Sequence, residues 1–241
     1  MEYGLQLYSV RDAMEKDVES TLAKVAQIGY KYVEFAGFFG HSAEEIKGWL
    51  DKYGLVCTGT HTGAEEVFDN TDACIEYHKT IGCNTIIIPW YDFKSEAEIE
   101  AFNDKIKAIQ PKLDAAGMTL GYHNHAHEFK MAESGFVPYS WLECKTNIRF
   151  EVDTYWAFVA KTNPVKVLER LGSRLCAIHV KDGLADGSKG KPLGQGEAPV
   201  ADVVAKAKEL GLLMVVESEN LQPDGLTEAE TCFAYLKSLE K

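Results

Sequence analysis

Histidine and acidic residues follow several short apolar runs of this chain, in a mixture that suits a metal centre. They stand at Glu34, at His61, in the segment from Tyr122 to Glu128, at Glu151 and Asp153, at His179 with Lys181 and Asp182, and at Glu217 and Glu219. Several unpaired carboxylates in a water-poor space repel each other strongly, and a divalent cation offsets that repulsion. Carboxylate mixed with imidazole, without thiolate, is typical of an open catalytic site for Mn²⁺, Mg²⁺, Co²⁺ or Zn²⁺. The residue types therefore predict a divalent metal cofactor, with Mn²⁺ expected first.

These side chains can meet only if the apolar runs are neighbouring strands of one sheet. An amphipathic stretch repeatedly ends in Gly before a short apolar run, as at Gly29 before Tyr32 and at Gly211 before Leu212. Glycine fits the left-handed position after a helix, and continuous apolar runs suit the buried strands of a parallel sheet. We predict strands near 4–9, 31–36, 55–60, 85–90, 118–123, 148–153, 175–180 and 212–217.

Helix start signals lie between these runs. Ser42 with Glu45 has the spacing of a capping box, and Asn163 before Pro164 is typical of a first helical turn. We predict helices near 16–28, 42–53, 70–81, 95–116, 138–144, 164–171, 199–210 and 226–240.

Eight βα units predict an α/β fold, a (β/α)₈ TIM barrel with a single domain over residues 1–241. No GxGxxG turn follows the first strand, so a dinucleotide-binding sheet is disfavoured. In such a barrel the working groups lie at the carboxyl ends of the strands, where the polar residues above stand. The glycine-rich segment 186–199 is predicted to be a mobile active-site loop after the seventh strand.

Overall charge and composition exclude several classes of function. Asp and Glu total 37 against 25 Lys and Arg, a formal net charge of −12, so we expect no nucleic-acid partner. The longest apolar runs are only strand-sized, so we expect no membrane span. The N-terminus lacks the pattern of a secretion signal, and no cysteine pair has CxxC spacing; both predict reduced thiols and a cytoplasmic protein.

Several motifs together resemble one family. They are Gly4 to Arg11, Tyr122 to Phe129, Val152 to Thr154, Ile178 to Asp182 and Leu193 to Glu197. In their order and strand positions they resemble the sugar phosphate isomerase/epimerase family of xylose isomerase-like TIM barrels, over essentially the whole chain. The resemblance implies a metal held by Glu, Asp, His and Glu at the ends of strands five to eight.

Three of these four positions match the family, namely Asp153, His179 and Glu217. The fifth strand departs from the pattern, because it ends in His123 where the family has Glu. We expect Glu128, a few residues further on, to supply the missing carboxylate. Direct ligation by His123 or His125 is the alternative.

The resemblance implies proton abstraction beside the carbonyl of a sugar-like substrate, with the metal stabilising the enediolate. Glu217 is the expected base, and Glu128 or His125 would return the proton from the opposite face. Small sugars or keto-glycosides are the expected substrates. The residues expected to bind the substrate are His61, His123, Lys181, Trp90 and Trp156.

Other interpretations stay open. The same enolisation followed by elimination gives a lyase, which cleaves a 3-keto-glycoside or dehydrates an inosose-like polyol. A nuclease resembling endonuclease IV is disfavoured by the net charge, and a non-catalytic barrel would have lost Asp153, His179 or Glu217. Phosphate on the substrate is doubtful, because only Lys181, Lys189 and Lys191 stand near the predicted mouth. A homo-oligomer is a family-level expectation.

Overall fold

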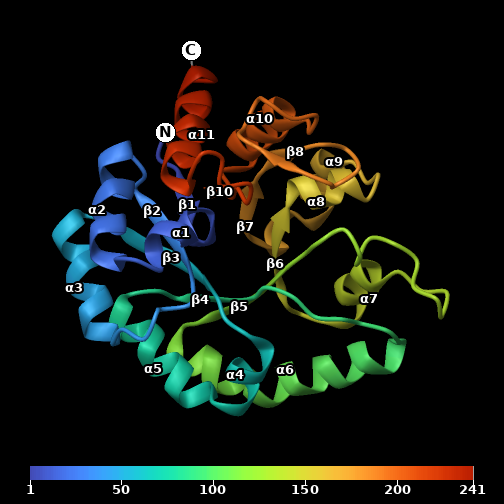
Figure 1. Cartoon of the computed structure of the whole chain (residues 1–241). Helices are drawn as coiled ribbons and strands as arrows, with labels where there is room; N and C mark the ends of the chain where they lie inside the picture. The colour runs from blue at the N-terminus through green and yellow to red at the C-terminus, as the bar shows by residue number, and fades with distance from the viewer. Residues whose placement is uncertain (241) are drawn as a thin grey trace.

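Parallel strands close into a barrel in the computed structural model, which describes residues 1–240 (Figure 1). The barrel strands are β1 (Gly4–Gln6), β2 (Tyr32–Ala36), β3 (Val56–His61), β4 (Thr85–Ile88), β5 (Thr119–His123), β6 (Arg149–Asp153), β7 (Leu175–Val180) and β10 (Met214–Val216). Each strand pairs with its neighbour in the chain, and β1 also pairs with β10, which closes the ring. The predicted (β/α)₈ barrel is confirmed.

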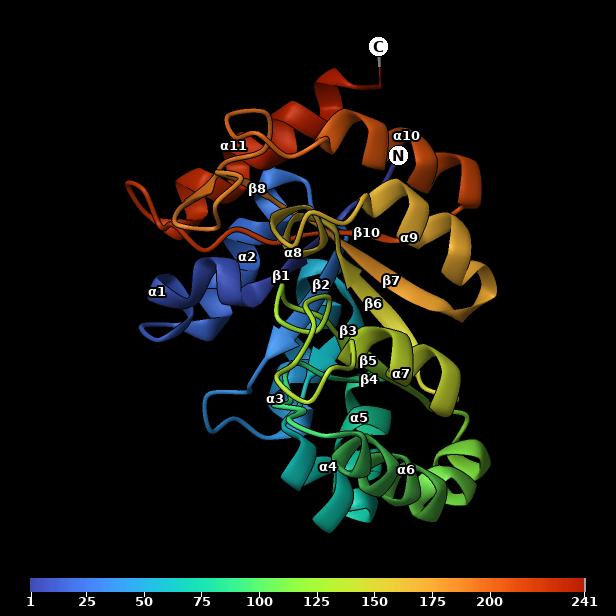
Figure 2. The ribbon, with the colours of Figure 1, turned by 90° about the vertical axis from the view of Figure 1, so that its right-hand side faces the viewer.

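Helices surround the strands on all sides (Figures 1 and 2). The main ones are α2 (Val18–Ile28), α3 (Ala43–Tyr53), α5 (Thr71–Ile81), α6 (Glu96–Ala116), α7 (Pro138–Lys145), α9 (Pro164–Leu171), α10 (Val200–Leu210) and α11 (Gly225–Ser238). The predicted capping box is present, because Ser42 and Glu45 each accept a hydrogen bond from the other's backbone N–H. Among residues 1–240, no helix has both the length and the apolar character to cross a membrane.

Short helices not predicted from the sequence lie at the strand ends. They are the 3₁₀ turns η1 (Leu7–Val10) and η2 (Gly172–Arg174), and the helices α1 (Arg11–Met14), α4 (Ala64–Asp69) and α8 (Thr154–Val159). The first strand is therefore shorter than the predicted 4–9. Its end is set by the Gln6 side chain, which accepts a hydrogen bond from the backbone N–H of Tyr8 at 3.0 Å and starts the 3₁₀ turn.

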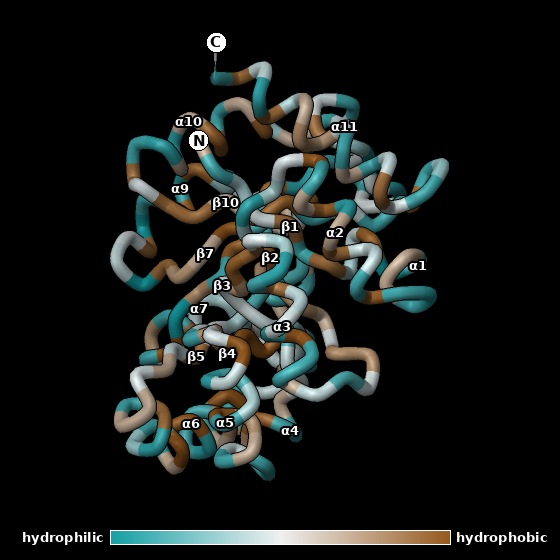
Figure 3. Tube along the Cα trace, turned by 90° about the vertical axis from the view of Figure 1, so that its left-hand side faces the viewer, coloured by the Kyte–Doolittle hydropathy of each residue, from teal (hydrophilic) through white to brown (hydrophobic). Residues whose placement is uncertain are grey.

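The hydrophobic core lies between the strands and the helices, and Figure 3 shows apolar stretches along β4 and β7 with hydrophilic ones on the outer turns. The inside of the barrel is polar near the carboxyl ends of the strands, where Gln6, Glu34 and Glu151 are at most 1% exposed. Gly59 makes room for one of them, because a Cβ there would lie 2.7 Å from Glu34 Oε2. The barrel thus encloses buried carboxylates.

The loop after β7 is tied to one buried side chain. It contains a small hairpin of β8 (Asp182–Gly183) and β9 (Gly190–Lys191), and Figure 2 shows it beside α11. The Asp182 carboxylate accepts hydrogen bonds from the backbone N–H groups of Gly183, Gly194, Gly196 and Ala198, at 2.8 to 3.1 Å. In the segment 186–199, which we predicted to be a mobile loop, three backbone amides are held by Asp182, namely those of Gly194, Gly196 and Ala198.

Replacing Asp182 with Asn should destabilise the fold. Asn keeps the shape, but its amide nitrogen would face backbone donors that the carboxylate now satisfies, so we expect a loss of about 3 kcal/mol in the free energy of unfolding. Urea unfolding followed by circular dichroism measures this loss. Asp186→Asn is the control, because Asp186 is exposed on the same loop and should affect unfolding little. Equal urea midpoints for the two variants would contradict this account of the loop.

Candidate metal centre and active site

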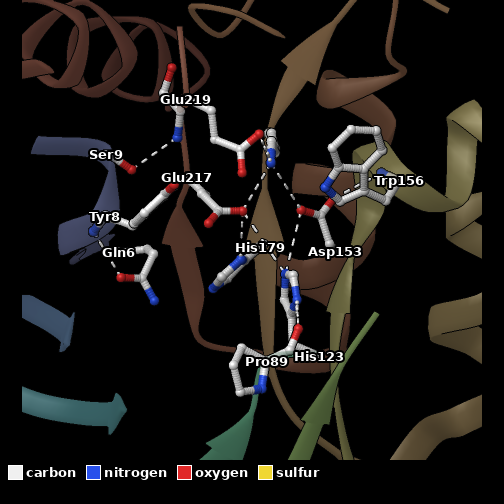
Figure 4. A network of polar contacts seen from close by, with 12 residues as sticks. Gln6, Tyr8, Ser9, Pro89, His123, Asp153, Trp156, His179, Glu217 and Glu219 are labelled. Carbon is white, nitrogen blue, oxygen red and sulfur yellow. Dashed lines mark hydrogen bonds and ion pairs between the residues drawn. The ribbon is translucent and has the colours of Figure 1, made fainter. Parts of the chain in front are cut away.

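Four side chains from neighbouring strands converge at the carboxyl end of the barrel. They are His123 at the end of β5, Asp153 at the end of β6, His179 in β7 and Glu217 directly after β10 (Figure 4). One potential ligand atom from each lies within 4.8 Å of the others, and all four residues are at most 4% exposed. The structure thus brings together Asp153, His179 and Glu217, with His123 as the fourth member.

Each imidazole of this group has one ring nitrogen beside an acceptor outside the group and the other directed at the group. Burial alone would lower the pKa of His179, but Glu151, Glu217 and Glu34 outweigh it and raise that pKa. His123 Nδ1 lies 3.2 Å from the Pro89 carbonyl oxygen, which can only accept, so Nδ1 carries the proton and Nε2 turns a lone pair to the centre. Burial, and next the nearby His179, hold the pKa of His123 well below its usual range. His179 Nε2 lies 2.9 Å from Glu34 Oε1, which leaves Nδ1 facing Glu217. A second partner of this kind orients most metal-binding histidines.

Asp153 is fixed so that one oxygen remains available. Its Oδ1 accepts from the backbone N–H of Trp156 at 2.9 Å and caps α8. The Asn124 amide exchanges two 3.2 Å hydrogen bonds with the Asp153 backbone. Asn124 was missed in the sequence, where its position between two histidines at the end of a predicted strand was the available signal. The structure buries this amide fully, and such a group needs polar partners.

Unsatisfied atoms in this group test whether a cation fits. His123 Nε2 and Asp153 Oδ2 are buried, and neither has a hydrogen-bond partner within residues 1–240; they lie 3.6 Å apart. Leaving such lone pairs without a partner costs free energy. A divalent cation would satisfy both atoms together with His179 and Glu217, so the residues present fit a bound metal.

A second polar layer lies deeper in the barrel. His61 Nε2 is 2.8 Å from Glu151 Oε2 and 3.1 Å from Glu34 Oε1, and Gln6 donates to the same Glu34 oxygen at 2.6 Å. Burial alone would lower the pKa of His61, but Glu34 and Glu151 outweigh it and raise the pKa to about 9. His61 is therefore an imidazolium at neutral pH.

Lys181 lies beside the group rather than in an open site. Its buried Nζ is 2.9 Å from Glu219 Oε2, 3.1 Å from Glu217 Oε2 and 3.7 Å from Asp153 Oδ2. These carboxylates outweigh the effect of burial and raise the pKa of Lys181. The Trp156 ring lies under the ammonium at 4.9 Å. Lys181 and Trp156, both predicted to bind substrate, contact each other, and neither lines the cavity described below.

Glu128, the predicted fourth ligand, lies outside the group. Its buried carboxylate accepts from the Tyr122 hydroxyl at 2.7 Å and from the backbone N–H of His125 at 2.8 Å. Burial raises the pKa of Glu128. The carboxylate therefore shapes the loop that carries His125, and the structure places the His123 imidazole where we expected Glu128.

A cavity of about 420 Å³ opens above the group. Its lining contains the predicted residues His61, Trp90, His123, His125 and Glu217, together with Tyr8, Ala36, Pro89 and Glu219. Burial, and next His123, lower the pKa of His125 to about 3, so its imidazole is neutral. The cavity thus presents a neutral imidazole, an imidazolium and carboxylates around one space.

The raised pKa of His61 predicts how the stability of the metal-free chain depends on pH. Since its pKa rises from 6.5 to about 9 on folding, the stabilisation is complete below pH 6.5 and is lost as the pH approaches 9. We expect the wild type to lose up to roughly 3 kcal/mol of unfolding free energy over this interval through His61. Urea unfolding with a chelator, at both pH values, measures the loss. His61→Gln should lack this component; equal losses in the two proteins would refute the assignment.

Comparisons with known proteins agree with this architecture. A family model described as xylose isomerase-like TIM barrel matches residues 22–239. No curated protein matches the chain. Among solved structures, a sugar phosphate isomerase/epimerase from Parabacteroides distasonis ATCC 8503 has a TM-score of 0.86 and 23% identity, over 98% of this chain and 97% of the other.

Two further structures are similar at lower identity. The probable 3-DHS dehydratase AsbF, involved in petrobactin synthesis in Bacillus anthracis, has a TM-score of 0.76 and 13% identity, over 98% of this chain and 99% of the other. The IOLI protein with a bound zinc atom has a TM-score of 0.77 and 12% identity, over 99% and 98%. These likenesses show the fold alone. The family model spans most of the sequence, and the chain therefore belongs to the family of xylose isomerase-like TIM barrels.

Proposed function

We propose that this protein is a metal-dependent isomerase or epimerase that enolises a sugar or keto-sugar. The residues proposed to hold the divalent cation are His123, Asp153, His179 and Glu217. The observation that carries the proposal is the buried group itself, in which His123 Nε2 and Asp153 Oδ2 have no hydrogen-bond partner within residues 1–240. The family assignment supports the reaction class.

The donor set bears on which cation binds. Two imidazoles and two carboxylates favour Mn²⁺, Co²⁺ or Zn²⁺ over Mg²⁺, which prefers oxygen ligands. Mn²⁺ remains our first expectation, and the zinc atom bound to the IOLI protein makes Zn²⁺ its main competitor. Bound at this site, the cation would supply Lewis-acid stabilisation of negative charge on a substrate oxygen.

The side chains in the cavity can move the protons. Lys181 and next His179 outweigh the effect of burial and hold the pKa of Glu217 well below its usual range, so its carboxylate is ionised and can accept a proton from carbon. His125 reaches the cavity from the β5 side with a neutral imidazole, which can accept a proton from the substrate or from water and return it once it is protonated. Two such groups on different sides of a substrate permit inversion at carbon.

A dehydratase or lyase is the second candidate, and His61 favours it. Elimination after enolisation needs a proton for the departing oxygen, and His61 is an imidazolium in the cavity wall. Its Nε2 is held by Glu34 and Glu151, so Nδ1–H is the donor left for a leaving group. The carbon-bound proton would pass to Glu217, and the hydroxyl would leave as water with the proton from His61.

Metal affinity tests whether His123 or Glu128 is the fourth ligand. We expect one Mn²⁺ or Co²⁺ per chelator-treated chain, measured by calorimetry and by metal analysis. His123→Ala should weaken binding by at least about 100-fold, because it removes a ligand, whereas Glu128→Gln should weaken it by less than about tenfold, because it alters only a supporting contact. The reverse order would identify Glu128 as the ligand.

Solvent isotope incorporation tests the reaction. The metal-loaded protein is incubated in D₂O with ketoses and with 3-keto-glycosides. Deuterium in a recovered isomer supports isomerisation or epimerisation, whereas an unsaturated ketone or a released aglycone supports elimination. Glu217→Gln should lower turnover by about 10²–10⁴-fold. Its metal content is measured in the same sample, and full turnover by a metal-loaded variant would refute Glu217 as the base.

A further inference from the structure

The mouth of the barrel has two different halves. The residues proposed to bind metal come from four consecutive strands of the ring, β5, β6, β7 and β10. The other four, β1 to β4, supply none of them and contribute Tyr8, Ala36, His61 and Trp90 to the cavity wall. A substrate that reaches the metal half therefore lies against a wall built largely of aromatic rings.

The two large aromatic rings of this wall are exposed, and each has another side chain beside it. Trp90 is 54% exposed and Tyr8 is 43% exposed, although both line the cavity. The Arg11 guanidinium lies 4.1 Å from the centre of the Tyr8 ring and donates to the Tyr8 and Glu219 carbonyl oxygens. The Trp90 ring has His127 beside it at 6.0 Å. Exposed rings held in place in this way offer flat apolar surface to the C–H face of a sugar.

The wall of the cavity offers no lysine or arginine side chain to an anion. Glu217 and Glu219 line the cavity, whereas within residues 1–240 no Lys or Arg does. Lys181 is bound to three carboxylates, Arg11 to two carbonyl oxygens, and His61 lies between Glu34 and Glu151. Even with a divalent cation added, the three negative charges of Asp153, Glu217 and Glu219 cancel those of the cation and Lys181.

We propose that the substrate is an uncharged sugar derivative whose ring lies against Trp90 and Tyr8, and that Glu219 makes the site reject phosphorylated and other anionic sugars. The inference rests on the proposed function for the metal half, and it names the class of substrate. An uncharged substrate differs from the sugar phosphate that appears in the name of the similar Parabacteroides protein. Phosphate sites in proteins present Arg, Lys or free backbone N–H groups, and the lining of this cavity has neither guanidinium nor ammonium.

Matched pairs of ligands test the substrate class without requiring turnover. The Mn²⁺-loaded full chain is titrated by calorimetry with D-fructose, D-tagatose and D-sorbose, and with the terminal phosphate ester of each, at equal ionic strength. At least one neutral ketose should bind, and about tenfold or more tightly than its ester. Tighter binding of the esters, or no binding of any neutral ketose, overturns the proposal.

Variants test the two parts of the proposal separately. Trp90→Ala and Tyr8→Ala should each weaken binding of the neutral ketose about 3- to 10-fold, whereas Leu210→Ala, which trims an exposed apolar residue at the other end of the barrel, should not. Glu219→Gln should raise the affinity of the ester relative to its parent ketose. The assignment is contradicted if Glu219→Gln leaves the ratio of ester affinity to ketose affinity unchanged. It is also contradicted if neither aromatic variant weakens binding of the ketose. If ketoses bind but the metal-loaded wild type does not convert them, the proposed reaction fails and this inference stands.

Discussion

Several carboxylates are buried inside the barrel, and the structure depends on how their negative charges are paired. Glu34, Glu151, Asp153 and Glu217 are each at most 4% exposed, and burying an ion costs several kcal/mol unless it is paired. His61, His179 and Lys181 are placed among these carboxylates, which leaves four acidic groups against three basic ones. If His179 binds a divalent cation through Nδ1 it is neutral, and the cation, Lys181 and His61 then supply four positive charges. With a cation bound in this way, the positive charges would equal those of the four buried carboxylates.

Other groups orient the residues proposed to bind the metal, and these groups belong to different elements. The β4 end provides the Pro89 carbonyl for His123, Asn124 holds the Asp153 backbone, and Glu34 on β2 holds His179. Asp182 fixes the loop that follows β7 through backbone amides. The fold itself therefore orients these side chains, as preorganised electrostatic stabilisation of a developing charge requires.

The fold was predictable because each βα unit repeats the same local signals, a capped helix, a glycine and an apolar run. Three site residues followed directly, since the carboxyl ends of neighbouring parallel strands meet wherever the exact strand ends lie. Glu128 could not be placed, because its direction depends on how the chain turns after β5, and there the carboxylate bends back to Tyr122. The surroundings of Lys181 could not be predicted for a similar reason, since spacing does not reveal that three carboxylates surround it. Side-chain direction in loops depends on tertiary contacts that no periodicity encodes.

The pairing of β1 with β10 has a consequence for how the protein folds. Gly4 pairs with Val215 and Leu5 with Val216, so the ring cannot close until the first and the last barrel strands have paired. Contacts so distant in the chain form late in folding, after the cost of bringing the ends together has been met. Glu217 directly follows the closing strand, so it joins His123, Asp153 and His179 only in the same step. A partial barrel that lacks β10 would present His123, Asp153 and His179 without the fourth residue proposed to bind the metal.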